Sequence, residues 1–308
     1  MKTSDKIVQY WKQNYIQETD AAVIERSLRT DTFDSGGKSL DLLYFEFNKQ
    51  APCILLSQGS FAHAYVFAEL AFHIHSYGYN VFVMPRHGGS TIAELVARHE
   101  DAVAHIIQKH HLIPGICAEG LGGFAAFYLI LKPGQIKSAV FLNAPAVLTD
   151  PEFHKSFKGK RGSASRRKWL MVVARVAVKM IPSFKIPIRL YLDLEEMIDA
   201  DGENYERERR LVSAFTNDPD FDTHYPLKAV YSLVSTPPPA PLNSLQVPTM
   251  FIVLNRGFIP DYFKKLFEEL SCKKKIKEVN AGVFWMLSRP KQAAFEITDW
   301  FNQTLEEK

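Results

Sequence analysis

The chain has 308 residues, of which 46% are hydrophobic and 23% charged, and its formal net charge is +3. This length allows one large α/β domain with an insertion, or two modest domains. The net charge alone is too small to indicate nucleic-acid binding, and the wide spacing of the three cysteines excludes a disulfide framework or a cysteine zinc site.

Two segments bear on membrane insertion and export. Residues 1–20 are too polar to form the apolar core of a signal peptide. The longest apolar stretch, residues 169–181, is shorter than the roughly 20 residues of a membrane span and contains Arg175 and Lys179. We therefore expect no transmembrane segment and a cytoplasmic location.

The first half of the chain predicts a hairpin followed by alternating strands and helices. An amphipathic opening helix covers about residues 4–26, and two strand-like segments follow on either side of the turn signal at residues 34–37. Buried strands are then expected at 51–59, 79–86, 115–120 and 137–145, with helices at 61–78, 91–110 and 124–133. Nearly continuous apolar strands separated by helices are typical of a parallel sheet covered on both faces.

After Pro145 this alternation stops for about 100 residues. Eleven Lys or Arg and no Asp or Glu occur between Lys155 and Arg189, whereas eight Asp or Glu and one Arg occur between Asp193 and Glu208. Strands at 249–255 and 274–282 and helices at 260–271 and 289–305 complete the pattern. We therefore expect a core formed by residues 1–148 and 246–308, interrupted by an insertion at 149–245.

Four segments in this order resemble the α/β-hydrolase fold superfamily. They are LLSQGSFAHA, an oxyanion-loop segment that keeps Gly59; VFVMPRHGGST, a turn segment; AEGLGG, a nucleophile elbow; and VNAGVFWMLSRP, the terminal histidine segment. The resemblance covers about half of the chain. It implies an α/β fold with a mostly parallel central sheet flanked by helices, in which the insertion takes the place of a helical cap.

The same resemblance implies a degenerate catalytic triad. Gly120 stands at the elbow apex, where the family has its serine, and Arg256 stands near the position of the acid. Val283 occupies the histidine position, and no histidine follows His224. Since a triad needs a nucleophile, a base and an acid that orients the base, we expect no triad hydrolysis.

The parts of a binding site remain. The backbone N–H groups of Ser60 and Phe61, after Gly59, and of Leu121, after the apex, are expected to form an oxyanion-like donor set. The other candidate binding residues are His63, Trp285 and Arg256. Arg256 has the alternative of pointing to solvent or of pairing with a nearby acid such as Glu119 or Asp261. Glu119, next to the apex, is expected to play a structural role and to point away from the pocket.

The basic insertion has two interpretations. A helix at about residues 165–180 would carry Trp169, Val172, Val173, Val176 and Met180 on one face. We favour this face as the roof of a pocket over the alternative, contact with an anionic membrane surface or an acidic partner.

The leading hypothesis is a non-catalytic binding, regulatory or scaffolding protein for a hydrophobic, acyl-type or anionic small molecule, or for a protein partner. The alternative is an active esterase-like or lipase-like hydrolase, or a lyase, that uses a group such as His63 or Ser60. A third reading is a subunit that packs against an active relative. No cofactor, metal or nucleic acid is predicted.

Overall fold

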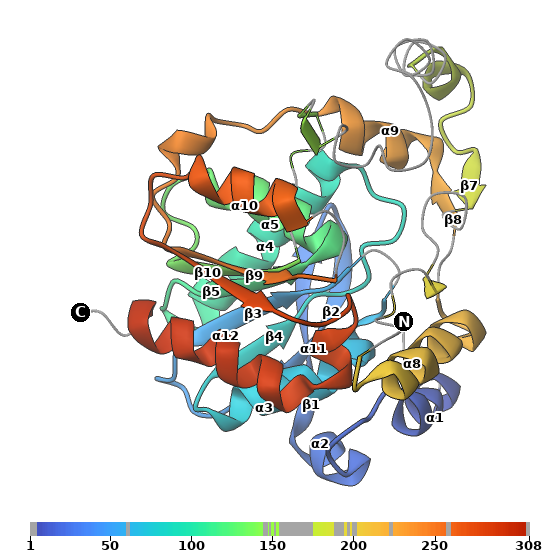
Figure 1. Cartoon of the computed structure of the whole chain (residues 1–308), viewed down its shortest axis with the longest axis vertical. Coiled ribbons are helices and arrows are strands. Elements are labelled where there is room, and N and C mark those ends of the chain that lie inside the picture. The colour runs from blue at the N-terminus through green and yellow to red at the C-terminus, as the bar shows by residue number, and fades with distance from the viewer. Residues whose placement is uncertain are drawn as a thin grey trace.

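The computed structural model describes residues 5–59, 62–143, 147, 149–150, 152–153, 175–187, 194–195, 198, 202–221, 224–256 and 260–305. An eight-stranded sheet in the order β1-β2-β4-β3-β5-β6-β9-β10 forms its centre (Figure 1). The strands are β1 (Leu28–Ser35), β2 (Lys38–Phe45), β3 (Cys53–Ser57), β4 (Asn80–Val83), β5 (Gly115–Glu119), β6 (Ser138–Leu142), β9 (Thr249–Leu254) and β10 (Lys274–Val279). β2 runs antiparallel to β1 and β4, and the other pairs are parallel, as the sequence predicts.

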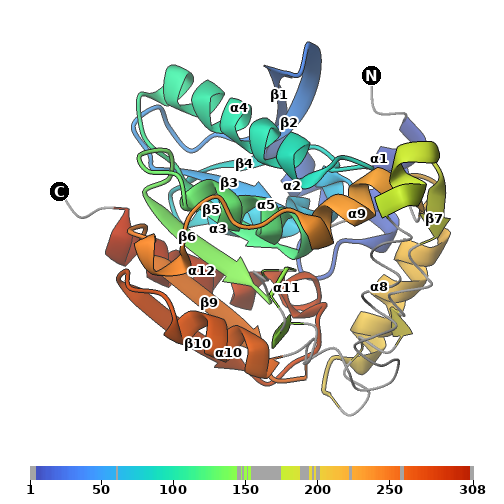
Figure 2. The ribbon, with the colours of Figure 1, turned by 90° about the horizontal axis from the view of Figure 1, so that it is seen from above.

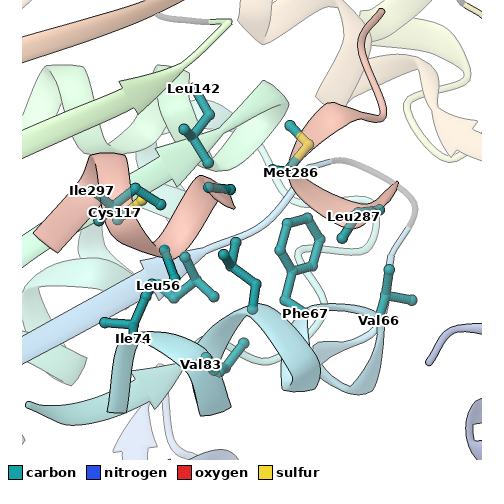
Figure 3. Close-up of a cluster of buried hydrophobic side chains, with 14 of the residues drawn as sticks. Leu56, Val66, Phe67, Ile74, Val83, Cys117, Leu142, Met286, Leu287 and Ile297 are labelled. Atoms are coloured by element: carbon teal, nitrogen blue, oxygen red, sulfur yellow. The ribbon is translucent and has the colours of Figure 1, made fainter. Parts of the chain in front are cut away.

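Helices cover both faces of this sheet (Figure 1). One face carries α3 (Ala68–Ser76) and α12 (Pro290–Thr304), and the other carries α4 (Ile92–His110), α5 (Gly120–Ile130) and α10 (Pro260–Glu268). Alternate side chains of each strand enter the two cores, so that Leu56 and Cys117 pack with Ile74 of α3 and Ile297 of α12 (Figure 3). Burial on both faces explains why these strands are almost entirely apolar in the sequence.

The opening helix predicted at residues 4–26 is wrong in one respect, because it is two helices. α1 (Asp5–Asn14) ends before an irregular segment, and α2 (Ala21–Ser27) begins after the cap residue Asp20. Between them the Glu69 carboxylate accepts the backbone N–H groups of Gln17, Glu18 and Thr19 at 2.7, 2.8 and 2.7 Å. This distant acceptor replaces the carbonyl partners that a continuous helix would provide.

Of the residues between β6 and β9, those that the structure describes do not join the central sheet. They include β7 (Lys185–Pro187), which pairs with β8 (His224–Pro226), and the helices α8 (Tyr205–Asn217), α9 (Leu227–Ser235) and η5 (Leu242–Ser244). In Figure 2, β7, α8 and α9 lie on the side toward which the arrows of β6 and β9 point. The predicted basic helix lies largely outside the described residues, which include only its end, a helical segment at 175–180.

Candidate functional site

The junction between β5 and α5 is a sharp strand-to-helix turn. β5 ends at Glu119 and α5 begins directly at Gly120, which has a φ of +53°. Residues with a side chain seldom adopt this left-handed conformation. Two positions on, the Gly122 N–H donates to the Gln58 carbonyl at 3.1 Å, and a Cβ on Gly122 would collide with that carbonyl and with Ser57. The turn thus has the geometry that the resemblance implies, with a glycine at its apex.

The Glu119 side chain lies against the segment that follows β3. Its carboxylate accepts the Gly59 N–H and packs so closely on the Gly59 Cα that a side chain there would overlap it. Burial raises the pKa of Glu119 to about 7, and the hydrogen bond from Gly59 opposes this rise. Glu119 therefore belongs beside the candidate donors; Ser60 and Phe61 themselves lie outside the described residues.

The positions at which the sequence resemblance expects the acid and the histidine, Arg256 and Val283, follow β9 and β10. Arg256 is exposed in the turn after β9, whereas Val283 is buried in the turn after β10. Because β5, β9 and β10 are parallel members of one sheet, both turns lie at the same edge as Gly120. Trp285, two residues after Val283, is buried, and its Nε1–H donates to the Gln292 Oε1 at 3.4 Å.

Apolar side chains pack around the turn that contains Val283. Phe215 of α8 lies over Phe284, with 5.5 Å between their ring centroids, and joins the insertion to the core. The short helix α11 (Trp285–Ser288) places Met286 and Leu287 beside Phe67 of η1 (Ala64–Phe67) (Figure 3). Among the described residues, Phe215 of α8 therefore covers the turn that contains Val283.

The prediction that the basic helix roofs the pocket is wrong for its described end. Val176 and Met180 belong to the predicted apolar face, yet they are 54% and 76% exposed. Neither side chain covers the core. The remaining residues of that face lie outside the described residues.

His63 and Asp218 form a buried pair that joins the core to the insertion. The His63 Nε2 lies 2.9 Å from the Asp218 Oδ2, and the Tyr15 hydroxyl donates to the same oxygen at 2.7 Å. Burial pushes the pKa of Asp218 upward, but hydrogen bonds from His63 and Tyr15 outweigh it and hold the pKa below its usual value. The His63 Nδ1 is buried and has no hydrogen-bond partner among the described residues.

The sequence indicates His63 as a candidate binding residue but does not indicate Asp218, which pairs with it, or Tyr15, which binds the same carboxylate. Asp218 lies 155 residues further along the chain and Tyr15 lies in the segment predicted as helix, so no local pattern connects them. Asp218 directly follows α8, and its Oδ1 accepts the Asp220 N–H at 2.8 Å. An aspartate that follows a helix and precedes Pro219-Asp220 is typical of a turn. The sequence therefore gives no indication that Asp218 pairs with His63.

A second buried histidine cluster lies beneath the elbow. The His99 Nδ1 donates to the Leu95 carbonyl at 2.7 Å, so its Nε2 accepts the Ser57 hydroxyl, also at 2.7 Å. The Ser57 oxygen in turn accepts the His87 Nε2–H at 3.1 Å. Burial lowers the pKa of His99 to about 4 and that of His87 well below its ordinary value, so both rings are neutral at pH 7.

This second cluster is closed to substrates, because Ser57, His87 and His99 are at most 1% exposed. Leu121, another candidate binding residue, has a buried side chain that packs with Leu95 of α4 and Ala229 of α9, so only its backbone N–H can contribute to a binding site.

In the described residues no group of three or more His, Cys, Asp or Glu side chains is arranged to hold a metal ion. The helices there are also too short or too polar to cross a membrane.

Comparisons with known proteins identify the architecture. No protein-family model matches the chain, and no curated protein matches its sequence. Among solved structures, DcsB in complex with a substrate analogue is 14% identical, with a TM-score of 0.67 over 90% of this chain and 100% of that chain.

Two further structures carry enzyme names. A monoacylglycerol lipase from Paleococcus ferrophilus is 17% identical, with a TM-score of 0.61 over 90% of this chain and 98% of that chain. The epoxide hydrolase VrEH1 from Vigna radiata is 14% identical, with a TM-score of 0.56 over 90% and 99%. Identities this low carry information on fold rather than on activity. Together with the strand order and the elbow, they show that this chain has the α/β-hydrolase fold.

Proposed function

We propose that this protein has no working serine–acid–histidine triad and serves as a non-catalytic binding, regulatory or scaffolding protein. The conformation of Gly120 carries the proposal. Its φ of +53° at the strand-to-helix junction supports its assignment as the apex residue, and glycine has no side-chain atom that could attack an acyl group. The proposal includes the division into a core, residues 1–148 and 246–308, and a cap, residues 149–245.

The other two positions support the same conclusion. Arg256 has the wrong charge to stabilise an imidazolium ion, and Val283 cannot accept a proton. Val283 is also buried, with 6% of its surface exposed. Three changes at three distant points of the sequence are hard to reconcile with retained triad chemistry.

The surroundings favour a hydrophobic or acyl-type ligand. Phe215 of the insertion packs against Phe284 of the core, and Phe221 packs against Phe215, so the contact between the two parts is aromatic. Amides at the start of α5, where the helix dipole is positive, suit a carbonyl or carboxylate group at one end of such a ligand. The alternative ligand in this proposal is a segment of a partner protein that likewise combines an apolar part with a carbonyl or carboxylate group.

Fluorophosphonate labelling and a panel of short and long acyl esters test the absence of a triad. We expect neither labelling nor turnover in the natural protein. Labelling of one serine, with turnover abolished when that serine is replaced by alanine, would overturn the proposal. Native mass spectrometry of the purified protein then identifies an acyl ligand by its mass.

The triple variant G120S/R256D/V283H tests the assignment of the three positions. If the assignment is right, the folded triple variant gains fluorophosphonate labelling at the introduced serine, whereas R256D/V283H does not. The matched pair differs only at the apex. A folded triple variant without labelling would contradict the assignment of these three positions.

His63 and Asp218 favour a second candidate, an active hydrolase or lyase of this fold. A buried imidazole that is paired through Nε2 with a carboxylate, and whose Nδ1 is unpartnered among the described residues, has the arrangement of a general base. Under this alternative, His63→Gln abolishes an ester hydrolysis that G120A leaves unchanged. If the natural protein turns over no acyl ester, the hydrolase form of this candidate fails.

A further inference from the structure

One short segment of the insertion exposes an unusual amount of apolar surface. Of nine large hydrophobic side chains that are exposed in the described residues, four fall between positions 176 and 184: Val176 (54%), Met180 (76%), Ile181 (50%) and Phe184 (59%). A single exposed apolar side chain is ordinary, but a contiguous group marks an interaction surface.

Basic side chains border this group. Arg175 and Lys179 lie one helical turn apart, on a stripe next to that of Val176 and Met180, and Lys185 follows Phe184. All three are exposed, and none forms an ion pair with another described residue. They belong to the stretch from Lys155 to Arg189, which has eleven Lys or Arg and no acidic residue. We call residues 175–185 the basic apolar surface.

The backbone of this surface is held to the body of the protein. The Leu227 N–H donates to the Phe184 carbonyl at 2.7 Å, and the Lys228 N–H donates to the Pro182 carbonyl at 3.1 Å. β7 then pairs with β8, whose Tyr225 is buried against α4 and α9. Figure 1 shows the segment at a corner of the molecule, away from the central sheet. The apolar side chains are thus presented outward on a fixed support.

We propose that the basic apolar surface docks the protein onto an anionic lipid bilayer. Adjacent basic and apolar stripes match the two layers of a membrane surface, since cations meet lipid phosphates while apolar side chains enter the acyl boundary. A nucleic acid would use the charges but leave Met180 and Phe184 in water. A second copy of the chain would bring two positive surfaces together, which like-charge repulsion opposes.

Vesicle cosedimentation tests this proposal. We expect the full-length protein to bind vesicles of phosphatidylcholine with about one-third phosphatidylserine, to bind pure phosphatidylcholine vesicles far less, and to be released by high salt. Phe184→Ser is expected to lower the partition coefficient at least ~10-fold, because a Phe side chain leaves the acyl boundary. Lys179→Glu with Lys185→Glu is expected to lower it at least ~25-fold.

Matched controls exclude a general effect of surface changes. Phe295 is 55% exposed on α12, so Phe295→Ser removes the same side chain elsewhere and is expected to leave vesicle binding unchanged. Lys38→Glu reverses an exposed charge elsewhere on the protein and is likewise expected to leave vesicle binding unchanged. Failure to bind anionic vesicles, or equal loss of binding in Phe295→Ser and Phe184→Ser, overturns the proposal. Concentration-dependent dimerisation that Phe184→Ser abolishes also overturns it, because a second copy then covers this surface.

Discussion

The surroundings of Glu119 affect the pKa of its carboxyl group in opposite directions. It stands at the start of α5, where the helix dipole favours an anion, and it accepts the Gly59 N–H, yet burial dominates and raises its pKa to about 7. An acidic side chain that titrates near neutral pH beside the elbow makes the charge of the candidate site depend on pH. Any anionic ligand held there is expected to bind more weakly as Glu119 ionises.

Glu119→Gln tests this ionisation through stability. A carboxyl whose pKa rises on folding contributes its full stability below pH 4.5, and the contribution is lost as the pH rises through 7. Between pH 5 and 8 the natural protein should therefore lose about 2 kcal/mol relative to Glu119→Gln, after allowance for partial exposure. Urea unfolding at both pH values measures the difference. The exposed Glu268→Gln serves as the control for the substitution itself.

His99 has the opposite dependence on pH. Its pKa of about 4 in the folded protein lies below the 6.5 of the unfolded chain, so its contribution is complete above pH 6.5 and is lost as the pH falls toward 4. The loss amounts to about 3 kcal/mol. Chemical unfolding of His99→Gln should show a flatter profile between pH 6.5 and 4 than the natural protein. An unchanged slope would mean that this ring is not held neutral.

At the scale of the elements, the strand-to-helix turn depends on glycines for two different reasons. Gly120 is needed for its positive φ, whereas Gly122 is needed because α5 starts in contact with the end of β3. The sequence motif shows both glycines but cannot separate their roles, since a turn and a close approach select the same residue.

Gly122→Ala is expected to destabilise the protein by at least ~3 kcal/mol, because its Cβ would overlap Ser57 and the backbone carbonyl of Gln58, which cannot move without disturbing β3. Gly134→Ala is the control. It meets nothing within 4 Å and carries only the strain of its φ of +83°, which corresponds to about 1–2 kcal/mol. Thermal or urea unfolding measures the loss of stability in each variant. Equal losses would contradict the close packing of α5 on β3.

The elements that the sequence predicts best are those that local pattern determines. The apolar runs that become β3, β5, β6 and β9 are buried on both faces, and the hairpin turn at Gly36-Gly37 has the chemistry that such turns require. The break after α1 was not predictable, because its cause is the Glu69 carboxylate, about fifty residues away in sequence. The pairing of His63 with Asp218 was not predictable either, because the two residues are 155 positions apart in sequence.

At the scale of the whole molecule, Asp218 joins three parts of the chain. Its carboxylate binds Tyr15 from the N-terminal segment and His63 from the loop before η1, and it belongs itself to the insertion. A parallel contact runs from the Tyr10 hydroxyl to the Ala214 carbonyl at 2.7 Å. The N-terminal segment therefore acts as a strap that ties the insertion to the core.

Asp218→Asn and Tyr15→Phe, singly and together, test this strap. Each variant should destabilise the protein, Asp218→Asn more, because it removes the charge that His63 and Tyr15 both bind in a buried site. The double variant should lose about 1–2 kcal/mol less than the sum of the two. Asp218 has a lowered pKa, so its contribution is present above pH 3.8 and is lost as the pH falls through its pKa in the folded protein.

Limited proteolysis at pH 7 then distinguishes local release from global loss of stability. If the strap holds the insertion, Asp218→Asn speeds cleavage within residues 149–245 while peptides of the central sheet stay protected from hydrogen exchange. The exposed Asp261→Asn serves as the matched control. Uniform loss of protection across the sheet and the insertion would show that Asp218 supports the whole fold rather than the position of the insertion over the elbow.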